Sequence, residues 1–172
     1  IRDSLNPTHL TVDGSHACAL DDNGVVCWGY NGNGETDVPV LSNPTFVTSK
    51  YGTSCALDDT GVVCWGVNDF DQVDVPALSN PREVAIGYYN TCALDDSGVV
   101  CWGDTTRSVA SDIPPLVNPS QLTMGDLHAC VKDNDRAICW ANGFSPANGE
   151  NTTYNQPSLS NPRQLVAGGY HV

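Results

Sequence analysis

The chain contains few basic residues. Seven lysines and arginines stand against 20 aspartates and glutamates among its 172 residues, and the formal net charge is -13. Proteins that bind nucleic acid place clustered lysine and arginine side chains against the phosphate backbone, so the sequence predicts no nucleic-acid partner. Much of the acid is aspartate in Asp-Asp-x-Gly sequences, a composition typical of turns.

Long apolar runs are also lacking. No stretch approaches the roughly 18 apolar residues that a membrane-spanning helix needs, so no span is predicted. The chain opens at Ile1 without a methionine, a basic segment or an apolar signal segment, which indicates a processed or excised segment. Apolar residues nowhere recur with the 3.6-residue period of a helix, and this favours an all-β fold.

Enzyme motifs are absent as well. The chain has no nucleophile elbow, no zinc-protease helix, no phosphate-binding loop, and no Ser, His and Asp that recur together. The Asp-Asp-x-Gly turns lack the alternating oxygen ligands and distal glutamate of a calcium loop, so only weak, adventitious calcium binding is compatible with them. We therefore expect no enzyme activity, no metal site and no cofactor.

Eight cysteines form the most informative pattern in the chain. They fall into four pairs, each with eight residues between its members and a tryptophan directly after the second. The intervening residues are almost identical in three copies and altered in the fourth, so the chain is a tandem repeat. The pairs are Cys18 and Cys27, Cys55 and Cys64, Cys92 and Cys101, and Cys130 and Cys139, followed by Trp28, Trp65, Trp102 and Trp140.

An Asn-Pro dipeptide marks the start of each unit. We expect a single repeat domain over residues 1–172, made of four units of about 37 residues or slightly more. A terminal stub follows and stops one residue before the place where a fifth cysteine pair would begin. The units are 6–42, 43–79, 80–117 and 118–160, and the stub is 161–172.

Each unit contains a predicted hairpin. In the first unit two apolar runs flank residues 21–24, which favour a tight turn that ends on a glycine in a left-handed conformation. Pairing Leu20 with Val25 across this turn leaves both faces of the hairpin apolar, so the hairpin must be packed between neighbours. The same register places Cys18 directly opposite Cys27.

The cysteine spacing predicts disulfides. Zinc ligands are usually separated by two to four residues, whereas eight intervening residues across a hairpin match the geometry of a bridge. Paired cysteines in a chain with a single methionine indicate an oxidising compartment. We therefore expect an extracellular protein, either secreted or on a cell surface.

A third extended segment precedes each hairpin. It begins shortly after the Asn-Pro turn, and it recurs in the stub. Three strands make a sheet too small to be stable alone, so we predict an all-β protein of stacked three-stranded sheets, arranged radially or linearly. The segments are 9–12, 46–48, 83–86, 121–124 and 164–167.

Residues 16–20 and 24–31 resemble the repeat of the regulator of chromosome condensation family of β-propellers. The resemblance covers nearly the whole chain. It is strongest to the bacterial, cysteine-bearing, short-repeat branch, and the unit is similar in size to the repeats of a secreted β-lactamase inhibitor protein of that class. The resemblance implies a β-propeller whose units are blades, and it says little about function.

The number of blades stays open at this point. Propellers of the family typically have about seven blades, more than four units and a stub provide. Three explanations compete. The chain is a fragment, an open solenoid or filament subunit whose stub pairs with the next molecule, or a compact ring of four or five blades.

Aromatic residues occur in two settings. The repeated tryptophans are predicted to lie in the core, because a large ring on an apolar face suits packing between blades. Aromatics in the connecting segments differ between units and suit partner binding, since Tyr is favoured at interface hot spots. The candidate partner-binding residues are Tyr30, Tyr51, Phe70, Tyr88, Tyr89 and Asp126.

We predict a non-catalytic extracellular propeller that acts as a protein-binding or scaffold module through its inter-strand loops. One alternative is a structural subunit of an extracellular filament or surface assembly formed by strand or blade complementation. A second alternative is a carbohydrate-binding propeller. Asn151 begins an Asn-Thr-Thr glycosylation acceptor in the long loop of the divergent fourth unit.

Overall fold

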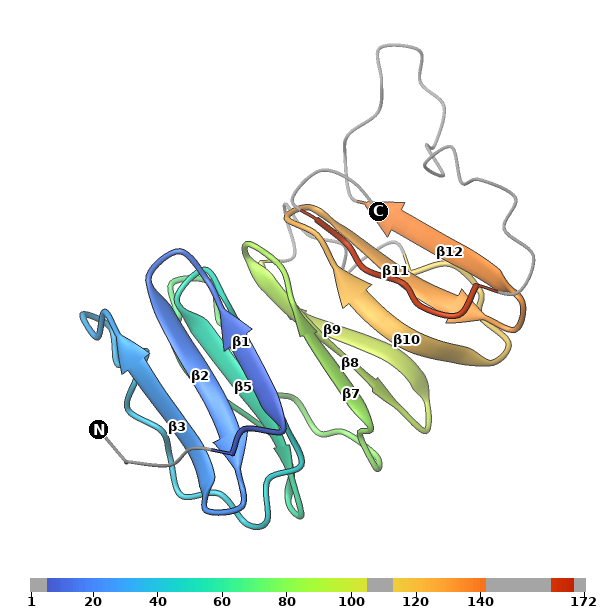
Figure 1. The fold of residues 1–172 in the computed structure, drawn as a ribbon. Coiled ribbons are helices and arrows are strands. Elements are labelled where there is room, and N and C mark those ends of the chain that lie inside the picture. The colour runs from blue at the N-terminus through green and yellow to red at the C-terminus, as the bar shows by residue number, and fades with distance from the viewer. Residues whose placement is uncertain (1–5, 105–112, 142–161, 169–172) are drawn as a thin grey trace.

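The computed structural model describes residues 6–104, 113–141 and 162–168. In these ranges the chain is all-β and contains no helix, as the sequence predicted. Twelve strands form four separate three-stranded antiparallel sheets, which stand side by side in chain order (Figure 1). Each sheet is one repeat unit, so the fold follows the repeat period of the sequence.

The second strand of every unit is the middle strand of its sheet. The first sheet contains β1 (His9–Val12), β2 (His16–Asp21) and β3 (Gly24–Gly29), and the second contains β4 (Phe46–Lys50), β5 (Thr53–Asp58) and β6 (Gly61–Gly66). The third contains β7 (Glu83–Ile86), β8 (Asn90–Asp95) and β9 (Gly98–Gly103), and the fourth contains β10 (Pro119–Met124), β11 (His128–Asp133) and β12 (Arg136–Ala141).

The predicted hairpin register is confirmed. Leu20 pairs with Val25 and Cys18 pairs with Cys27. The last residue of the turn, Gly24, has a φ of 106°, which a side-chain-bearing residue would rarely adopt. All four predicted disulfides are present, one in each sheet.

Hydrogen bonds to the first aspartate of each Asp-Asp pair explain the acidic turns. Asp58 accepts a bond of 2.7 Å from the backbone N–H of Thr60 and one of 2.8 Å from the N–H of Ser42. The second bond ties the turn that precedes the sheet to the hairpin turn of the same sheet. Asn43 has a φ of 50°, and its Nδ2 donates to Asp59 at 2.6 Å, so the Asn-Pro motif also has a structural reason.

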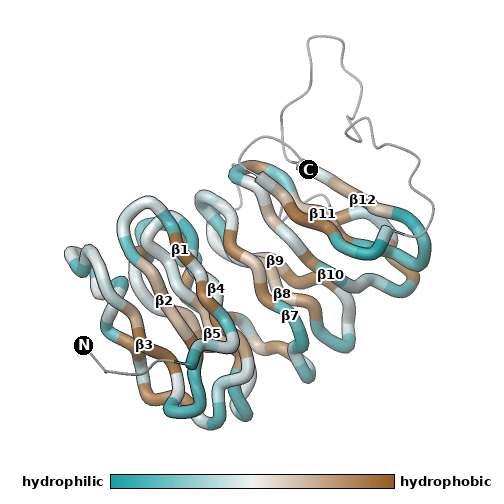
Figure 2. The backbone as a smooth tube through the Cα atoms, viewed as in Figure 1, coloured by the Kyte–Doolittle hydropathy of each residue, from teal (hydrophilic) through white to brown (hydrophobic). Residues whose placement is uncertain are grey.

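Neighbouring sheets pack through two different faces. The disulfide face of the first sheet, with Cys18 and Leu20, contacts Val47, Ala56 and Trp65 on the tryptophan face of the second. The same arrangement recurs between the third and fourth sheets, where Cys92 packs in one cluster with Ala129 and Trp140. Apolar residues accordingly follow the strands, while the turns are hydrophilic (Figure 2).

The prediction of a buried tryptophan is wrong for Trp28. Trp65, Trp102 and Trp140 are 5 to 8% exposed, whereas Trp28 is 46% exposed. The reason is that the tryptophan face is covered by the preceding sheet, and no described sheet precedes the first.

The stub departs from the strand predicted at 164–167. Residues 162–168 form no strand, although hydrogen bonds hold them alongside β10. The N–H of Ala167 donates to Thr123 Oγ1 at 3.1 Å, and Gln121 Nε2 donates to the carbonyl of Arg163 at 2.9 Å. β10 itself has an irregular register between Ser120 and Thr123, which removes the regular edge that a further strand would need.

Candidate partner-binding surface

The strand directions give the stack of sheets two rims. The hairpin rim holds the Asp-Asp turns, such as the one between β2 and β3. The loop rim, at the opposite end, holds the connections after the first and third strands of each sheet, including residues 51–52, 67–73, 87–89 and 125–127.

Four of the candidate aromatic residues form a continuous row on the loop rim. The ring centroids of Tyr51 and Tyr88 are 4.5 Å apart, those of Tyr88 and Tyr89 are 4.2 Å apart, and those of Tyr89 and Phe70 are 4.8 Å apart. Tyr51 and Tyr88 occupy matching places in neighbouring units, which explains why the stacking of two sheets brings them together. We call these four residues the aromatic row.

The aromatic row is open to solvent over most of its length. Tyr51 is 40% exposed, Tyr88 is 43% exposed and Phe70 is 36% exposed. Tyr51 and Gly52 join β4 to β5, with φ values of 52° and 77°. Two positive φ values in a two-residue hairpin connection are typical of a type I′ turn, in which a tyrosine is an uncommon residue. Strained residues of this kind cluster at functional sites.

Asp126 anchors one end of the row. Its Oδ1 lies 3.5 Å from Lys50 Nζ, which also donates to the carbonyl of Met124 at 3.1 Å and lies 5.5 Å from the centroid of the Tyr51 ring. Burial lowers the pKa of Lys50, and the charge of Asp126 opposes this effect only in part. Because Asp126 is itself buried, it orders the row through Lys50 instead of presenting a carboxylate to a partner.

Tyr30 does not belong to the row. It lies after β3 in the first unit, where its N–H donates to the carbonyl of Ser15 at 3.0 Å. Its ring lies over Gly32, so closely that a side chain at that glycine would collide with it. Tyr30 is exposed, but the ring contacts of the row do not include it.

A hollow of about 490 Å³ lies next to the row, between the first strands of the sheets. Its walls include Val12, Phe46, Ile86 and Met124, and Tyr51 stands at its edge on the loop rim. Thr48, Ser49 and Lys50 also line the hollow, so its walls are both polar and apolar, and such walls are suited to accept part of a polypeptide partner.

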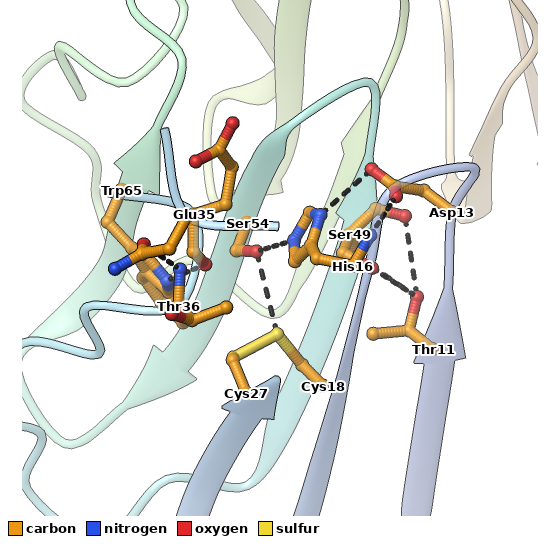
Figure 3. The surroundings of a disulfide bond; sticks show 11 residues. Thr11, Asp13, His16, Cys18, Cys27, Glu35, Thr36, Ser49, Ser54 and Trp65 are labelled. Carbon is orange, nitrogen blue, oxygen red and sulfur yellow. Dashed lines mark hydrogen bonds and ion pairs between the residues drawn. A yellow bond between two sulfur atoms is a disulfide. The ribbon is translucent and has the colours of Figure 1, made fainter. Parts of the chain in front are cut away.

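Asp13, His16 and Ser54 form a contact that the sequence did not predict (Figure 3). His16 Nδ1 lies 3.0 Å from Asp13 Oδ2, and His16 Nε2 lies 2.7 Å from Ser54 Oγ. This is the order of groups in a hydrolase triad. Ser54 is 0% exposed, however, and its Oγ lies 3.6 Å from the Cys18 sulfur, so a substrate has no path to the hydroxyl.

The contact joins the first sheet to the second. Burial would raise the pKa of Asp13, but backbone N–H groups of Gly52, His16 and Ser15 outweigh it and hold that pKa below its ordinary value. An Asp13 side chain that stays ionised suits a structural role. Sequence analysis missed the group because Ser54 comes from another unit and occupies a place that Ala17, Thr91 and Ala129 fill elsewhere.

The described ranges contain neither a metal-binding cluster nor a membrane-spanning helix. In residues 6–104, 113–141 and 162–168 no three His, Cys, Asp or Glu side chains are grouped so that they could hold a metal ion. The same ranges contain no helix long and apolar enough to cross a membrane. The glycosylation acceptor predicted at Asn151 lies outside the described residues.

Residues 82–108, most of the third unit, match the sequence profile described as the regulator of chromosome condensation (RCC1) repeat. The third unit is thus similar to an RCC1 repeat. This confirms the resemblance drawn from the sequence. No curated protein sequence matches the chain.

Solved structures of several proteins share the fold of the chain. The ectodomain of the Physcomitrella patens receptor kinase CR4 is 26% identical with a TM-score of 0.77, over 99% of this chain and 47% of the other. The Arabidopsis thaliana ACR4 ectodomain is 23% identical with a TM-score of 0.72, over 99% and 59%. Prp20p from Saccharomyces cerevisiae, described with its binding to Gsp1p and histones, is 15% identical with a TM-score of 0.71, over 98% and 55%. The chain thus spans about half the length of these structures.

Proposed function

We propose that this chain is a non-catalytic protein-binding module whose RCC1 repeats present the aromatic row to a partner. The observation that carries the proposal is the row itself, four aromatic side chains from two neighbouring units in mutual contact on one rim. The similar structure of Prp20p supports a binding role, since that protein is described with its binding to Gsp1p and histones.

Energetics favour the row as a contact surface. Tyrosine and other aromatic side chains bury a large area on binding and have few rotatable bonds. Rings that already pack against each other lose little further freedom when a partner arrives, so more of the contact energy appears as affinity. The partly buried Lys50 and the buried Asp126 hold one end of the row in place before binding.

An extracellular location is part of the proposal. Each sheet contains a disulfide, and cross-links of this kind persist in oxidising compartments. Two of the similar structures are receptor ectodomains, which is consistent with this location. The burial of Ser54 argues against hydrolysis at the triad-like contact of Asp13, His16 and Ser54.

A random-peptide display library tests the proposal. We expect the selection to enrich peptides that bind the wild-type chain and lose at least about tenfold in affinity when Tyr88 is changed to Ala, the size of an interface hot spot. Tyr30→Ala is the matched control, because Tyr30 is an exposed tyrosine outside the row. Peptides that bind both variants equally, or no enrichment at all, would contradict the proposal.

A second candidate function is blade complementation in an extracellular assembly. Leu10 and Val12 are 62 and 67% exposed, and with Trp28 they form an apolar face at the start of the stack. The equivalent face of the second sheet is covered by the first. If copies join through this face, light scattering will show particles larger than a monomer, and Trp28→Arg will abolish them. A monomer at all concentrations would remove this candidate.

A further inference from the structure

We propose that the Phe70 end of the aromatic row recognises a cationic side chain, lysine or arginine, in an extended basic segment of the partner. This inference rests on the proposed function, because it names the chemistry of the partner that the row binds. It concerns Phe70 and Tyr89, whose rings meet edge to face at 4.8 Å and 77°.

The loop that carries Phe70 is acidic. Asp69 and Asp71 flank Phe70 in the sequence, and both are exposed. Across the ring contact, the N–H of Asp104 donates to the carbonyl of Tyr89 at 3.0 Å, so the backbone that follows β9 lies beside the row. The negative face of an aromatic ring attracts cations, and adjacent carboxylates add to that attraction.

The opposite end of the row already holds an ammonium group. Lys50 Nζ lies over the Tyr51 ring at 5.5 Å and beside the carboxylate of Asp126 at 3.5 Å. The combination of a tyrosine ring with an aspartate therefore binds a lysine within the protein itself. The same two kinds of group recur at the Phe70 end, where the loop from Val67 to Asp74 contains no lysine or arginine.

The hairpin rim provides a contrast. It also carries aspartates, and some of these bind groups of the protein, as when Asp96 pairs with Arg82 at 3.4 Å and accepts from Asn80 at 2.7 Å. The other lysines and arginines of the described ranges lie near that rim, namely Lys132, Arg136 and Arg163. Among the described basic residues, Lys50 alone lies on the loop rim. The negative charge of the loop that carries Phe70 is therefore complementary to the positive charge of a basic partner.

The display selection described above distinguishes the two proposals. Among peptides that require Tyr88, we expect enrichment of lysine and arginine over the input library, and replacement of these residues by glutamine should weaken binding about five- to tenfold. Raising the salt concentration from 0.1 to 1 M should weaken binding as well, because charge attraction at an exposed site is screened.

Two double variants with equal net charge locate the effect. Asp69→Asn with Asp71→Asn should weaken the basic peptides about tenfold, whereas Asp22→Asn with Asp135→Asn on the hairpin rim should leave affinity unchanged. Asparagine tolerates the positive φ of Asp71, 59°, and thermal melts confirm that both variants fold.

Each remaining outcome overturns the inference. Row-dependent peptides without basic residues would leave the proposed function intact and refute the cationic partner. Equal losses in both double variants would show only a general charge effect. Binding of neutral oligosaccharides through Phe70, measured on a glycan array with Phe70→Ala as reference, would make the row a carbohydrate site.

Discussion

The indole Nε1 of Trp65 donates a hydrogen bond of 3.0 Å to the backbone carbonyl of Glu35. This bond joins the second sheet to the segment that leaves the first. The next pair of sheets repeats it, with Trp102 donating to the carbonyl of Gln72 at 2.9 Å. The fixed position of tryptophan in the repeat therefore has two reasons. Its ring packs against the disulfide face of the preceding sheet, and its indole N–H donates a hydrogen bond to a buried backbone carbonyl.

Trp65→Phe tests this relationship. The variant keeps an aromatic ring but leaves the Glu35 carbonyl without its donor, so we expect a loss of about 1 to 3 kcal/mol in the free energy of unfolding. Trp28→Phe is the matched control, because Trp28 is exposed, and should change stability by less than about 0.5 kcal/mol. Urea titration measures both, and equal losses would contradict the account.

Acid should destabilise the fold through the turn aspartates. Burial would raise the pKa of Asp95, but bonds from Ser79 and Ser97 outweigh it and hold the pKa below its ordinary value of 3.8. Asp58 behaves in the same way. A pKa lowered by folding means that stability is complete above about pH 5 and is lost as the pH falls through 4 and below.

The melting temperature should therefore be nearly constant from pH 7 to 5 and fall below pH 4. Asp95→Asn should lower the melting temperature at pH 7 and make the acid decrease smaller, because the charged acceptor is already gone. Asp22→Asn, at the exposed second position of an equivalent turn, is the control. An unchanged acid profile in Asp95→Asn would refute the assignment.

Ser54→Ala tests the structural role of the triad-like contact. The change leaves His16 Nε2 buried without the Ser54 hydroxyl, so we expect a loss of about 1 to 3 kcal/mol in the free energy of unfolding. If the hydroxyl instead were a nucleophile, a fluorophosphonate probe would label the wild-type chain at Ser54, and the variant would lose labelling without losing stability. Mass spectrometry of the probe-treated protein separates these results.

Disulfides should contribute measurably to each sheet. Replacing Cys92 and Cys101 together by Ala should cost roughly 2 to 3 kcal/mol, because the bridge closes a loop of about ten residues in the unfolded chain. Ellman titration of the wild-type chain in denaturant without reductant should find no free thiol among its eight cysteines. Eight reactive thiols would contradict both the bridges and the extracellular proposal.

The sheets could be predicted from the sequence because each repeat unit contains all three strands of one sheet. The register of Cys18 with Cys27 follows from the length of one turn, and the acidic turns follow from the preferences of Asp and Gly. The exposure of Trp28 was not predictable in this way, because it depends on the order of the sheets and not on the unit that contains Trp28.

The candidate surface was predictable only in part. The sequence identified Tyr51, Tyr88, Tyr89 and Phe70 as variable aromatics, but their mutual contact depends on how two sheets stack. Tyr30 satisfies the same sequence criterion and lies elsewhere. Contacts between units, such as the one from His16 to Ser54, join residues that no single repeat contains and therefore leave no pattern in the sequence.

The most direct test of the account is a nitrogen-edited NMR titration of the labelled chain with a display-selected basic peptide. The amides of Gly52 and Gly87 lie on the loop rim beside the row, and those of Gly61 and Gly98 lie on the hairpin rim. The account predicts concentration-dependent shifts for the first pair and none for the second. Shifts confined to the hairpin rim, or spread equally over both rims, would contradict it.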